Sequence, residues 1–186
     1  MSRIARFSPR ELDEDQRRLY AAITAGDRAQ GPQFFRLTDD EGRLEGPFNA
    51  MLLNPRIGDA LQRLGAAIRY GGRLSTRCRE IAILAVAAHW RCEFEQHAHE
   101  PIAAHAGLSA EQVAALRNAE PLDLADAEEA AVLEATRALL RDGALDDDGY
   151  AAAVDAIGAD KLFELTTLVG YYSLLALQMN VFVGPE

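Results

Sequence analysis

Apolar residues recur at helical spacing along most of this chain. The run Ile81–Ala88 is apolar on every side of a helix, and a helix of that kind is normally buried all round. Further helical patterns cover residues 126–141, 147–157 and 160–181, and the last of these becomes almost wholly apolar toward its end. These periodicities predict an all-α protein, and the abundance of alanine, the best helix former, agrees with them.

Capping signals predict where several helices begin and end. Ser8-Pro9-Arg10-Glu11 has the pattern of a helix start, and we expect that helix to run to about Ala25. Residues 26–46, rich in Gly, Asp and Gln, are predicted to be irregular. A short helix is predicted over Pro47–Leu53, and a second helix should begin at Asn54-Pro55 and end near Gly71. Ser75 or Thr76 should cap the next helix. Gly107 should end the helix that comes after this one, and the capping box from Ser109 to Gln112 should begin another.

Length and charge narrow the classes of protein that this chain can represent. Its 186 residues fit one domain spanning 1–186, and no linker divides it. The net charge of −10 argues against a nucleic-acid partner, because phosphate binding requires clustered Lys and Arg. The apolar stretches are too short or too interrupted for a membrane span, and no secretory signal is visible. With only two cysteines, a cytoplasmic protein with reduced thiols is expected.

Three reactive side chains are spaced to share one side of a helix. The chain should bend near Trp90-Arg91, after which a second helix carries Cys92 onward. At 100° per residue, Cys92 and His99 lie within ~20° of each other, and Glu95 lies beside them. A thiol, a carboxyl and an imidazole in this arrangement can exchange protons or bind one substrate. We therefore predict a site where the buried helix meets a polar pocket.

The sequence around these residues resembles a known family. The segments that carry the resemblance are Arg77-Cys-Arg-Glu80, the apolar run, Trp90-Arg-Cys92-Glu-Phe-Glu95, His99 and Ala106-Gly107-Leu-Ser109. They resemble the carboxymuconolactone decarboxylase family, which includes the alkylhydroperoxidase D-like proteins, and the resemblance covers about residues 46–116. It implies an all-α, alkylhydroperoxidase D-like helical bundle, assembled as homotrimers or hexamers with sites near subunit boundaries.

The resemblance also implies roles for individual residues. In peroxidase-type members a glutamate, two cysteines and a histidine form a proton relay, and Glu80, Cys92 and His99 match three of them. Glu95 stands where the second cysteine belongs. Cys78, the other thiol of the chain, would lie ~20 Å from Cys92 along a straight helix, whereas a disulfide requires Cα atoms within roughly 7 Å. A two-cysteine peroxidase cycle is therefore doubtful. A one-cysteine cycle stays open if the helix N-terminus lowers the pKa of Cys92.

The decarboxylase branch of the family suits a carboxylate in place of the second thiol. Loss of CO₂ from a carboxylated lactone leaves an electron-rich carbon that must be protonated, and His99 suits proton delivery. Glu80 or Glu95 could hold the histidine tautomer or act as the acid. Arg91 or Arg73 could anchor a substrate carboxylate, since arginine binds carboxylates bidentately.

Three functions remain open on the sequence. The first is a cofactor-independent decarboxylase or related lyase acting on a small carboxylated lactone or an aromatic-degradation product. The second is a thiol-dependent hydroperoxide reductase using Cys92, and the third is a non-catalytic binding or assembly protein. We expect Trp90 to line the substrate pocket. Cys92, Glu95, His99 and His89 could formally hold a metal, but nothing marks a metal motif, so neither metal nor cofactor is expected.

Overall fold

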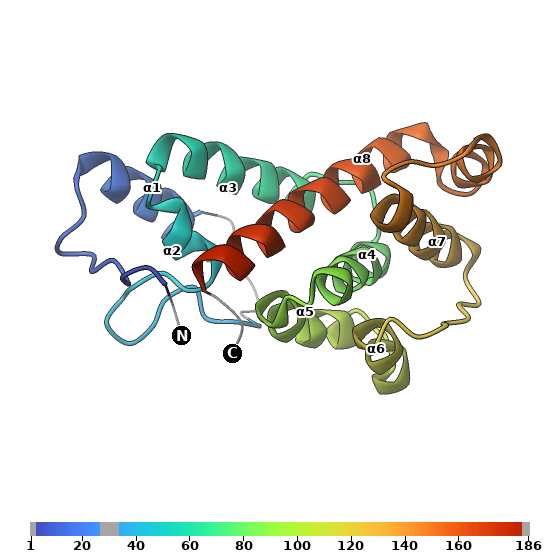
Figure 1. Cartoon of the computed structure of the whole chain (residues 1–186), viewed down its shortest axis with the longest axis horizontal. Helices are drawn as coiled ribbons and strands as arrows, with labels where there is room; N and C mark the ends of the chain where they lie inside the picture. The colour runs from blue at the N-terminus through green and yellow to red at the C-terminus, as the bar shows by residue number, and fades with distance from the viewer. Residues whose placement is uncertain (1–2, 27–33, 184–186) are drawn as a thin grey trace. The chain divides into compact units, whose positions relative to one another are not determined.

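The computed structural model describes residues 3–26 and 34–183 (Figure 1). Over these residues the chain forms eight α-helices and no β-strand, with one isolated bridge between Thr38 and Leu44. The helices are α1 Glu14–Thr24, α2 Pro47–Met51, α3 Pro55–Tyr70, α4 Thr76–Trp90, α5 Glu93–His105, α6 Ala110–Arg117, α7 Ala127–Asp142 and α8 Asp147–Phe182. The prediction of an all-α fold is confirmed.

Most predicted helix boundaries agree with the structure, and one is wrong. Helix α1 begins at Glu14 rather than near Ser8, because Asp13 and Gln16 form the capping box. Ser8 instead accepts a hydrogen bond from the Glu11 amide in a turn. The predicted irregular segment 26–46 falls partly on residues 27–33, outside the described residues, and its remainder contains no helix.

The caps of the other helices follow the sequence signals. Asn54 caps α3, Ser75 caps α4 and Ser109 forms a capping box with Gln112 at α6. Gly107 adopts the left-handed conformation (φ 94°) just after α5 ends. The two helices predicted at 147–157 and 160–181 are both present within α8, separated by a non-helical Gly158 (φ 80°). Local capping chemistry therefore sets most of the helix boundaries.

The chain divides into two compact units. The first, residues 1–71 and 177–186, contains α1, α2 and α3, and α3 contacts both of the others. Gly58 permits this packing, since a Cβ added there would lie 2.5 Å from the Met51 carbonyl oxygen. Asn49 on α2 is hydrogen-bonded to the Phe7 amide and the Ala5 carbonyl, which ties the N-terminal segment to α2.

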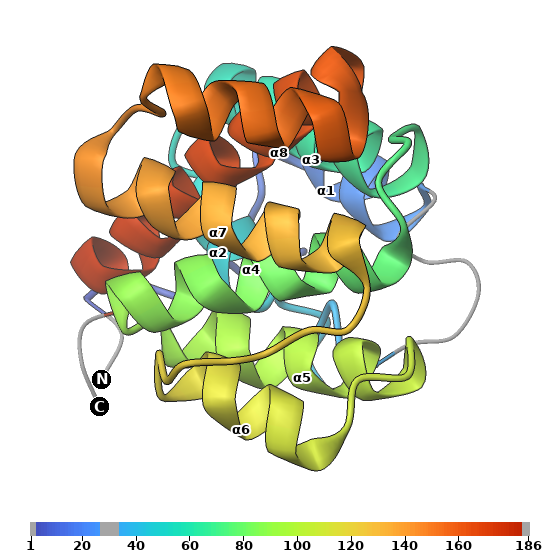
Figure 2. The same ribbon diagram turned by 90° about the vertical axis from the view of Figure 1, so that its right-hand side faces the viewer.

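The second unit, residues 72–176, is built around α4. Figure 2 shows α4 lying between α7 on one side and α5 and α6 on the other, and α4 contacts all three. Every residue of α4 from Glu80 to Ala87 is buried, as the uninterrupted apolar run predicts. The core around α4 includes Leu84, Leu116 and Leu133, each at most 3% exposed. Glu80 is therefore a carboxylate at the start of the most buried helix of this unit.

Helix α8 is the one helix of the described residues that could cross a membrane by length and composition alone. Its sequence also carries the charged residues Asp160, Lys161 and Glu164. Leu165 and Leu168 of the same helix are fully buried against the rest of the protein. A core helix of a soluble protein has these properties, so α8 does not by itself indicate a membrane protein.

Candidate acid–base site

The candidate site depends on a chain reversal between α4 and α5. Arg91 adopts the left-handed conformation (φ 51°, ψ 45°), and the Cys92 amide bonds back to the Ala87 carbonyl. These features end α4 at Trp90 and start α5 at Glu93, so that the two helices pack against each other. The reversal brings Glu80 on α4 to His99 on α5, which a straight helix could not do.

His99 lies between two carboxylates. Its Nδ1 is 2.7 Å from Glu80 Oε2, and its Nε2 is 3.4 Å from Glu95 Oε2. The three residues are at most 3% exposed. The Tyr172 ring on α8 packs against the imidazole in a T-shaped arrangement, with ring centroids 5.3 Å apart. Glu95 and His99, two of the three residues predicted to share a helix face, thus form a buried cluster with Glu80.

The two carboxylates set the charge of His99. Burial opposes the charged imidazolium, but the Glu80 carboxylate, by charge and hydrogen bonding, and the Glu95 carboxylate outweigh it. Together they raise the pKa of His99 from 6.5 to about 9. At neutral pH His99 is therefore an imidazolium that donates Nδ1–H to Glu80 and presents Nε2–H to Glu95.

One oxygen of the cluster has no partner. Glu95 Oε1 is buried and accepts no hydrogen bond within the described part of the chain. A buried carboxylate oxygen without a partner costs about 1–3 kcal/mol or more. Such an oxygen is a natural place for a transferred proton or for a donor group of a bound substrate. Glu95 Oε1 therefore forms the open end of the Glu80–His99–Glu95 chain.

Arg79 also lies at this cluster and was not predicted to do so. Its Nε lies 3.9 Å from Glu80 Oε1, and its side chain is 12% exposed. Arg79 thus brings a second cationic group to a cluster that already contains His99 and two glutamates. The sequence signal was available, because Arg79 directly precedes Glu80, but neighbours along a helix usually point apart.

The structure corrects the prediction for Cys92. Cys92 is not inside the helix but is the residue before it, and its sulfur makes no capping hydrogen bond. Burial raises the pKa of the Cys92 thiol to about 11, and the nearby Glu95 and Glu93 carboxylates add to the effect. The condition for a one-cysteine cycle, a Cys92 pKa lowered by the helix N-terminus, is therefore not met. Desolvation and like charge outweigh the helix dipole here.

Cys78 lies in a different cluster. It is buried on α4, and burial, with Glu128 adding to it, raises the pKa of its thiol to about 11. Its sulfur is 3.8 Å from Glu128 Oε1, and the same oxygen forms an ion pair with Lys161. Cys78 and Cys92 are both free thiols in the structure.

The three predicted substrate-binding residues lie at different places around the unit. Arg91 is exposed at the junction of α4 and α5, next to Cys92 in sequence, and has no carboxylate partner among the residues described. Arg73 is exposed and pairs with Asp160, 2.6 Å away. Trp90 is partly buried, and its ring contacts that of His89 edge to face. Of the three, Arg91 alone is an exposed cation next to the cluster in sequence and without an opposite charge.

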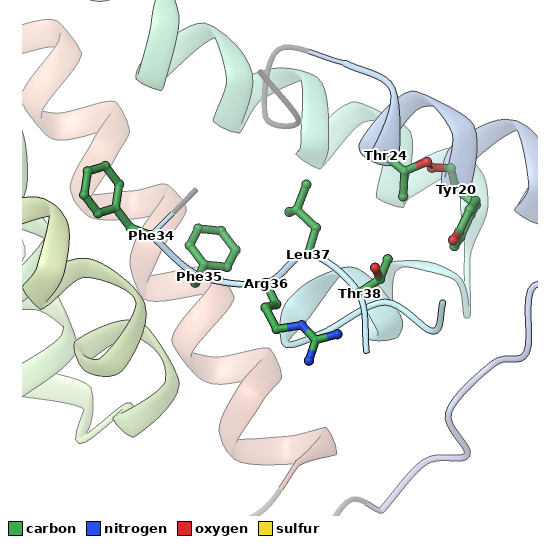
Figure 3. A pocket seen from close by; sticks show the side chains of 7 residues that line it. All are labelled: Tyr20, Thr24, Phe34, Phe35, Arg36, Leu37 and Thr38. Atoms are coloured by element: carbon green, nitrogen blue, oxygen red, sulfur yellow. Dashed lines mark hydrogen bonds between the residues drawn. The ribbon is translucent and has the colours of Figure 1, made fainter. Parts of the chain in front are cut away.

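The larger hollows of the structure lie elsewhere. One hollow of about 500 Å³ belongs to the first unit and is lined by Tyr20, Thr24 and residues 34–38 (Figure 3). Its polar groups are partly used, since Tyr20 Oη donates to the Gly42 carbonyl. Two others, of about 370 and 350 Å³, belong to the second unit. None of the three is lined by Glu80, Cys92, Glu95 or His99, whose side chains are buried.

No group of three or more His, Cys, Asp or Glu side chains among the described residues is arranged to hold a metal ion. The cluster itself explains this, because both nitrogens of His99 face carboxylate oxygens and are committed to proton sharing. A histidine can bind a metal only through a nitrogen whose lone pair is free. What the cluster can do is hold and move a proton.

Comparison with known proteins relates this cluster to a family. Residues 55–138 match the family described as the carboxymuconolactone decarboxylase family. Over this segment the chain is similar to that family. Glu80, Cys92, Glu95 and His99 all lie inside the matched segment, which overlaps most of the predicted 46–116 and extends beyond it. The predicted resemblance is confirmed.

A solved structure shares the fold. It is the crystal structure of a protein of unknown function from Agrobacterium tumefaciens, with a suggested role in antioxidant defence as an AhpD protein. The TM-score is 0.64 at 16% sequence identity, and the match covers 76% of this chain and 98% of the other. The sequence has no match among curated proteins. The structural likeness supports the AhpD-like all-α fold, and at this identity it supports the fold alone.

Proposed function

We propose that this protein is a member of the carboxymuconolactone decarboxylase family and a cofactor-independent acid–base enzyme. It acts on a small carboxylated lactone or a related aromatic-degradation product, and proton transfer runs along Glu80, His99 and Glu95. The observation that carries the proposal is the buried imidazole between two carboxylates, with Glu95 Oε1 left unpartnered. This arrangement stores a proton away from water and has one open end.

The geometry suggests a separate role for each residue. Both ring nitrogens of His99 face carboxylates, so His99 acts through Glu95 and does not itself touch the substrate. Glu80 fixes the ring through Nδ1 and is, like His99, a positioning residue. We assign the catalytic role to Glu95, because its Oε1 is the buried oxygen of the cluster that has no hydrogen-bond partner among the described residues. This differs from the sequence-based hypothesis, in which His99 delivers the proton directly.

A decarboxylation at this site would proceed in two steps. The bond between the lactone carbon and the substrate carboxylate breaks, CO₂ leaves, and the electron pair moves into the conjugated lactone carbonyl as a dienolate. Glu95 then takes the Nε2 proton of the His99 imidazolium and gives it to the carbon, which restores the Glu95 carboxylate and leaves His99 neutral until solvent returns a proton. Positioned proton transfer of this kind contributes roughly 10²–10⁴-fold to a rate. Arg91, which follows α4 and has no carboxylate partner among the described residues, is our proposed anchor for the substrate carboxylate.

The thiol route has less support. With its pKa raised to about 11, roughly one Cys92 in ten thousand is a thiolate at pH 7. A carboxylate, Glu95, occupies the position where a resolving thiol is needed. Peroxide reduction by Cys92 would therefore be slow.

Two assays on the same variants separate the candidates. We expect the wild-type protein to release CO₂ from a γ-carboxylated unsaturated lactone, and Glu95→Gln to be at least ~100-fold slower. Cys92→Ser should change this rate less than ~3-fold, and Glu93→Gln, an exposed glutamate of the same helix turn, serves as the matched control. Peroxide consumption that requires Cys92, with no lactone turnover, would refute the proposal.

We also propose that the protein acts in the cytoplasm as a homo-oligomer. Phe163 is 75% exposed and, with Tyr150, lines the apolar hollow of about 350 Å³ in the second unit. Large exposed apolar side chains are typical of association surfaces. Light scattering coupled to size exclusion should show a trimer or hexamer, and Phe163→Glu should shift it toward the monomer. A monomeric wild-type protein would refute this.

A further inference from the structure

The second unit contains a cavity that the proposed chemistry does not use. Its volume is about 370 Å³, within the range of small-molecule sites. Helix α4 contributes Ala85, Ala88 and His89, and the rest of the lining comes from the end of α6 and from α7, namely Leu116, Ala119, Arg137, Leu140 and Arg141. The cavity therefore has its own set of lining residues, distinct from the acid–base cluster.

Apolar and cationic groups occupy different depths of this cavity. Leu116 and Ala85 are 1% and 9% exposed and form the inner wall. His89 and Arg141 are exposed, and Arg137 is partly exposed, so the nitrogen-bearing groups lie toward solvent. An apolar interior below a cationic rim matches a molecule with an apolar body and an anionic head.

Arg137 is the group that makes this cavity selective. Its Nη2 donates to the Glu120 carbonyl oxygen at 2.6 Å, which restricts the orientations of the guanidinium. Within the described part of the chain, Arg137 has no carboxylate partner, although the protein carries a net charge of −10. A preorganised guanidinium retains donors that bind a carboxylate bidentately.

Arg141 is a weaker candidate for the same role. Its guanidinium already pairs with Asp142 at 2.7 Å, and the nearby Glu134 and Asp146 carboxylates also face its charge. A ligand carboxylate would have to compete with these groups. The charge of the rim is therefore dominated by Arg137.

We propose that this cavity binds a small organic carboxylate with an apolar body, with Arg137 holding the carboxylate and Leu116, Leu140 and the alanines contacting the rest. The anionic head alone could equally be a free phosphate, so the apolar walls must contribute to binding. The site is separate from the Glu80–His99–Glu95 chain, and it stands whether or not the proposed reaction is correct.

Calorimetric titration of the full-length protein at low salt tests this with three probes. Cyclohexanecarboxylate carries both the charge and the apolar body, cyclohexylmethanol lacks the charge, and inorganic phosphate lacks the apolar body. The first should bind at least ~10-fold more tightly than either of the others, because a charged hydrogen bond and apolar burial are each worth more than 1.4 kcal/mol. Trp90, the one tryptophan of the chain, contacts His89 at the rim and should report binding by a change in emission.

Variants distinguish a built site from general electrostatic attraction. Arg137→Gln should weaken the binding of cyclohexanecarboxylate at least ~10-fold, and Arg141→Gln should weaken it less than ~3-fold. Arg18→Gln, which changes an exposed arginine outside the cavity, should leave the affinity unchanged. Ala88→Leu should abolish the binding of cyclohexanecarboxylate, because the larger side chain would fill the cavity. This variant tests the proposal if Arg137→Gln does not fold.

Two results would overturn the proposal. One is equal binding of cyclohexanecarboxylate to the wild-type protein and to folded Arg137→Gln or Ala88→Leu. The other is phosphate binding as tightly as the organic acid. Retained binding in Glu95→Gln is expected, and its loss would also count against a separate site.

Discussion

Removing the charge of His99 should change how the stability of this protein depends on pH. The pKa of His99 is raised from 6.5 to about 9 in the folded protein, by Glu80 and Glu95 acting against burial. A group whose pKa is raised on folding stabilises the folded state fully below its unfolded pKa. That contribution is lost as pH rises through the folded value. The window in which it is lost is therefore pH 6.5 to about 9.

The size of the effect follows from the same two values. The rise from 6.5 to about 9 corresponds to about 3 kcal/mol, lost at roughly 1.4 kcal/mol per pH unit across the window. This is a large part of the 5–15 kcal/mol typical of a domain. The pKa values of Cys78 and Cys92 are raised to about 11, so these thiols change the pH dependence of the unfolding free energy only above pH 9. Between pH 6.5 and 9 the change therefore comes from His99.

Urea unfolding at several pH values between 6 and 9 measures this directly. The free energy of unfolding of the wild-type protein should fall by about 3 kcal/mol more than that of His99→Gln, which cannot take up the proton. His97→Gln, an exposed histidine of the same helix, should run parallel to the wild type. If His99→Gln does not fold, Glu80→Gln should flatten the wild-type slope in the same window. Parallel curves for the wild type and His99→Gln would show that the imidazole is not held as a cation.

Three further changes test other parts of the structure. In the folded protein at pH 8, the Cys92 thiol should react with a disulfide reagent at least ~100-fold more slowly than in the urea-unfolded protein. The reason is that the folded protein buries this thiol and raises its pKa. Equal reaction rates in the two states would contradict this. Arg77→Met should lower the free energy of unfolding by about 3 kcal/mol, since it leaves the largely buried Glu129 carboxylate without its ion pair. Chemical denaturation measures this change, and a decrease below ~1 kcal/mol would contradict the reasoning. Gly58→Ala should cost about 2–4 kcal/mol, because its Cβ would overlap the Met51 carbonyl oxygen; an unchanged melting temperature would refute that reasoning.

Local signals in the sequence predicted most of the fold. The caps at Asn54 and Ser75 and the box at Ser109 satisfy backbone groups within one helix turn, so their chemistry can be identified without tertiary information. The start of α1 was misplaced because Ser8 and Asp13 both precede suitable partners. The choice between them depends on packing, which the sequence does not show.

Helical spacing predicted that Glu95 and His99 lie together, but it did not predict how Glu80 reaches them. Cys92, Glu95 and His99 share spacing on one segment, whereas Glu80 reaches them only through the left-handed turn at Arg91. A residue other than glycine rarely adopts the left-handed conformation, so sequence propensities do not predict this turn at Arg91. The charge of His99 and the raised pKa of Cys92 both depend on burial and on neighbours from two helices.

The central claim is that His99 is a buried imidazolium bridging two carboxylates, and nitrogen NMR of the ¹⁵N-histidine-labelled protein tests it most directly. The chain has four histidines, so His99→Gln assigns the signal. At pH 7.5 both ring nitrogens of His99 should show the shifts of protonated nitrogen and should titrate near pH 9. A neutral tautomer at pH 7.5, with one unprotonated nitrogen, would contradict the proposed proton relay.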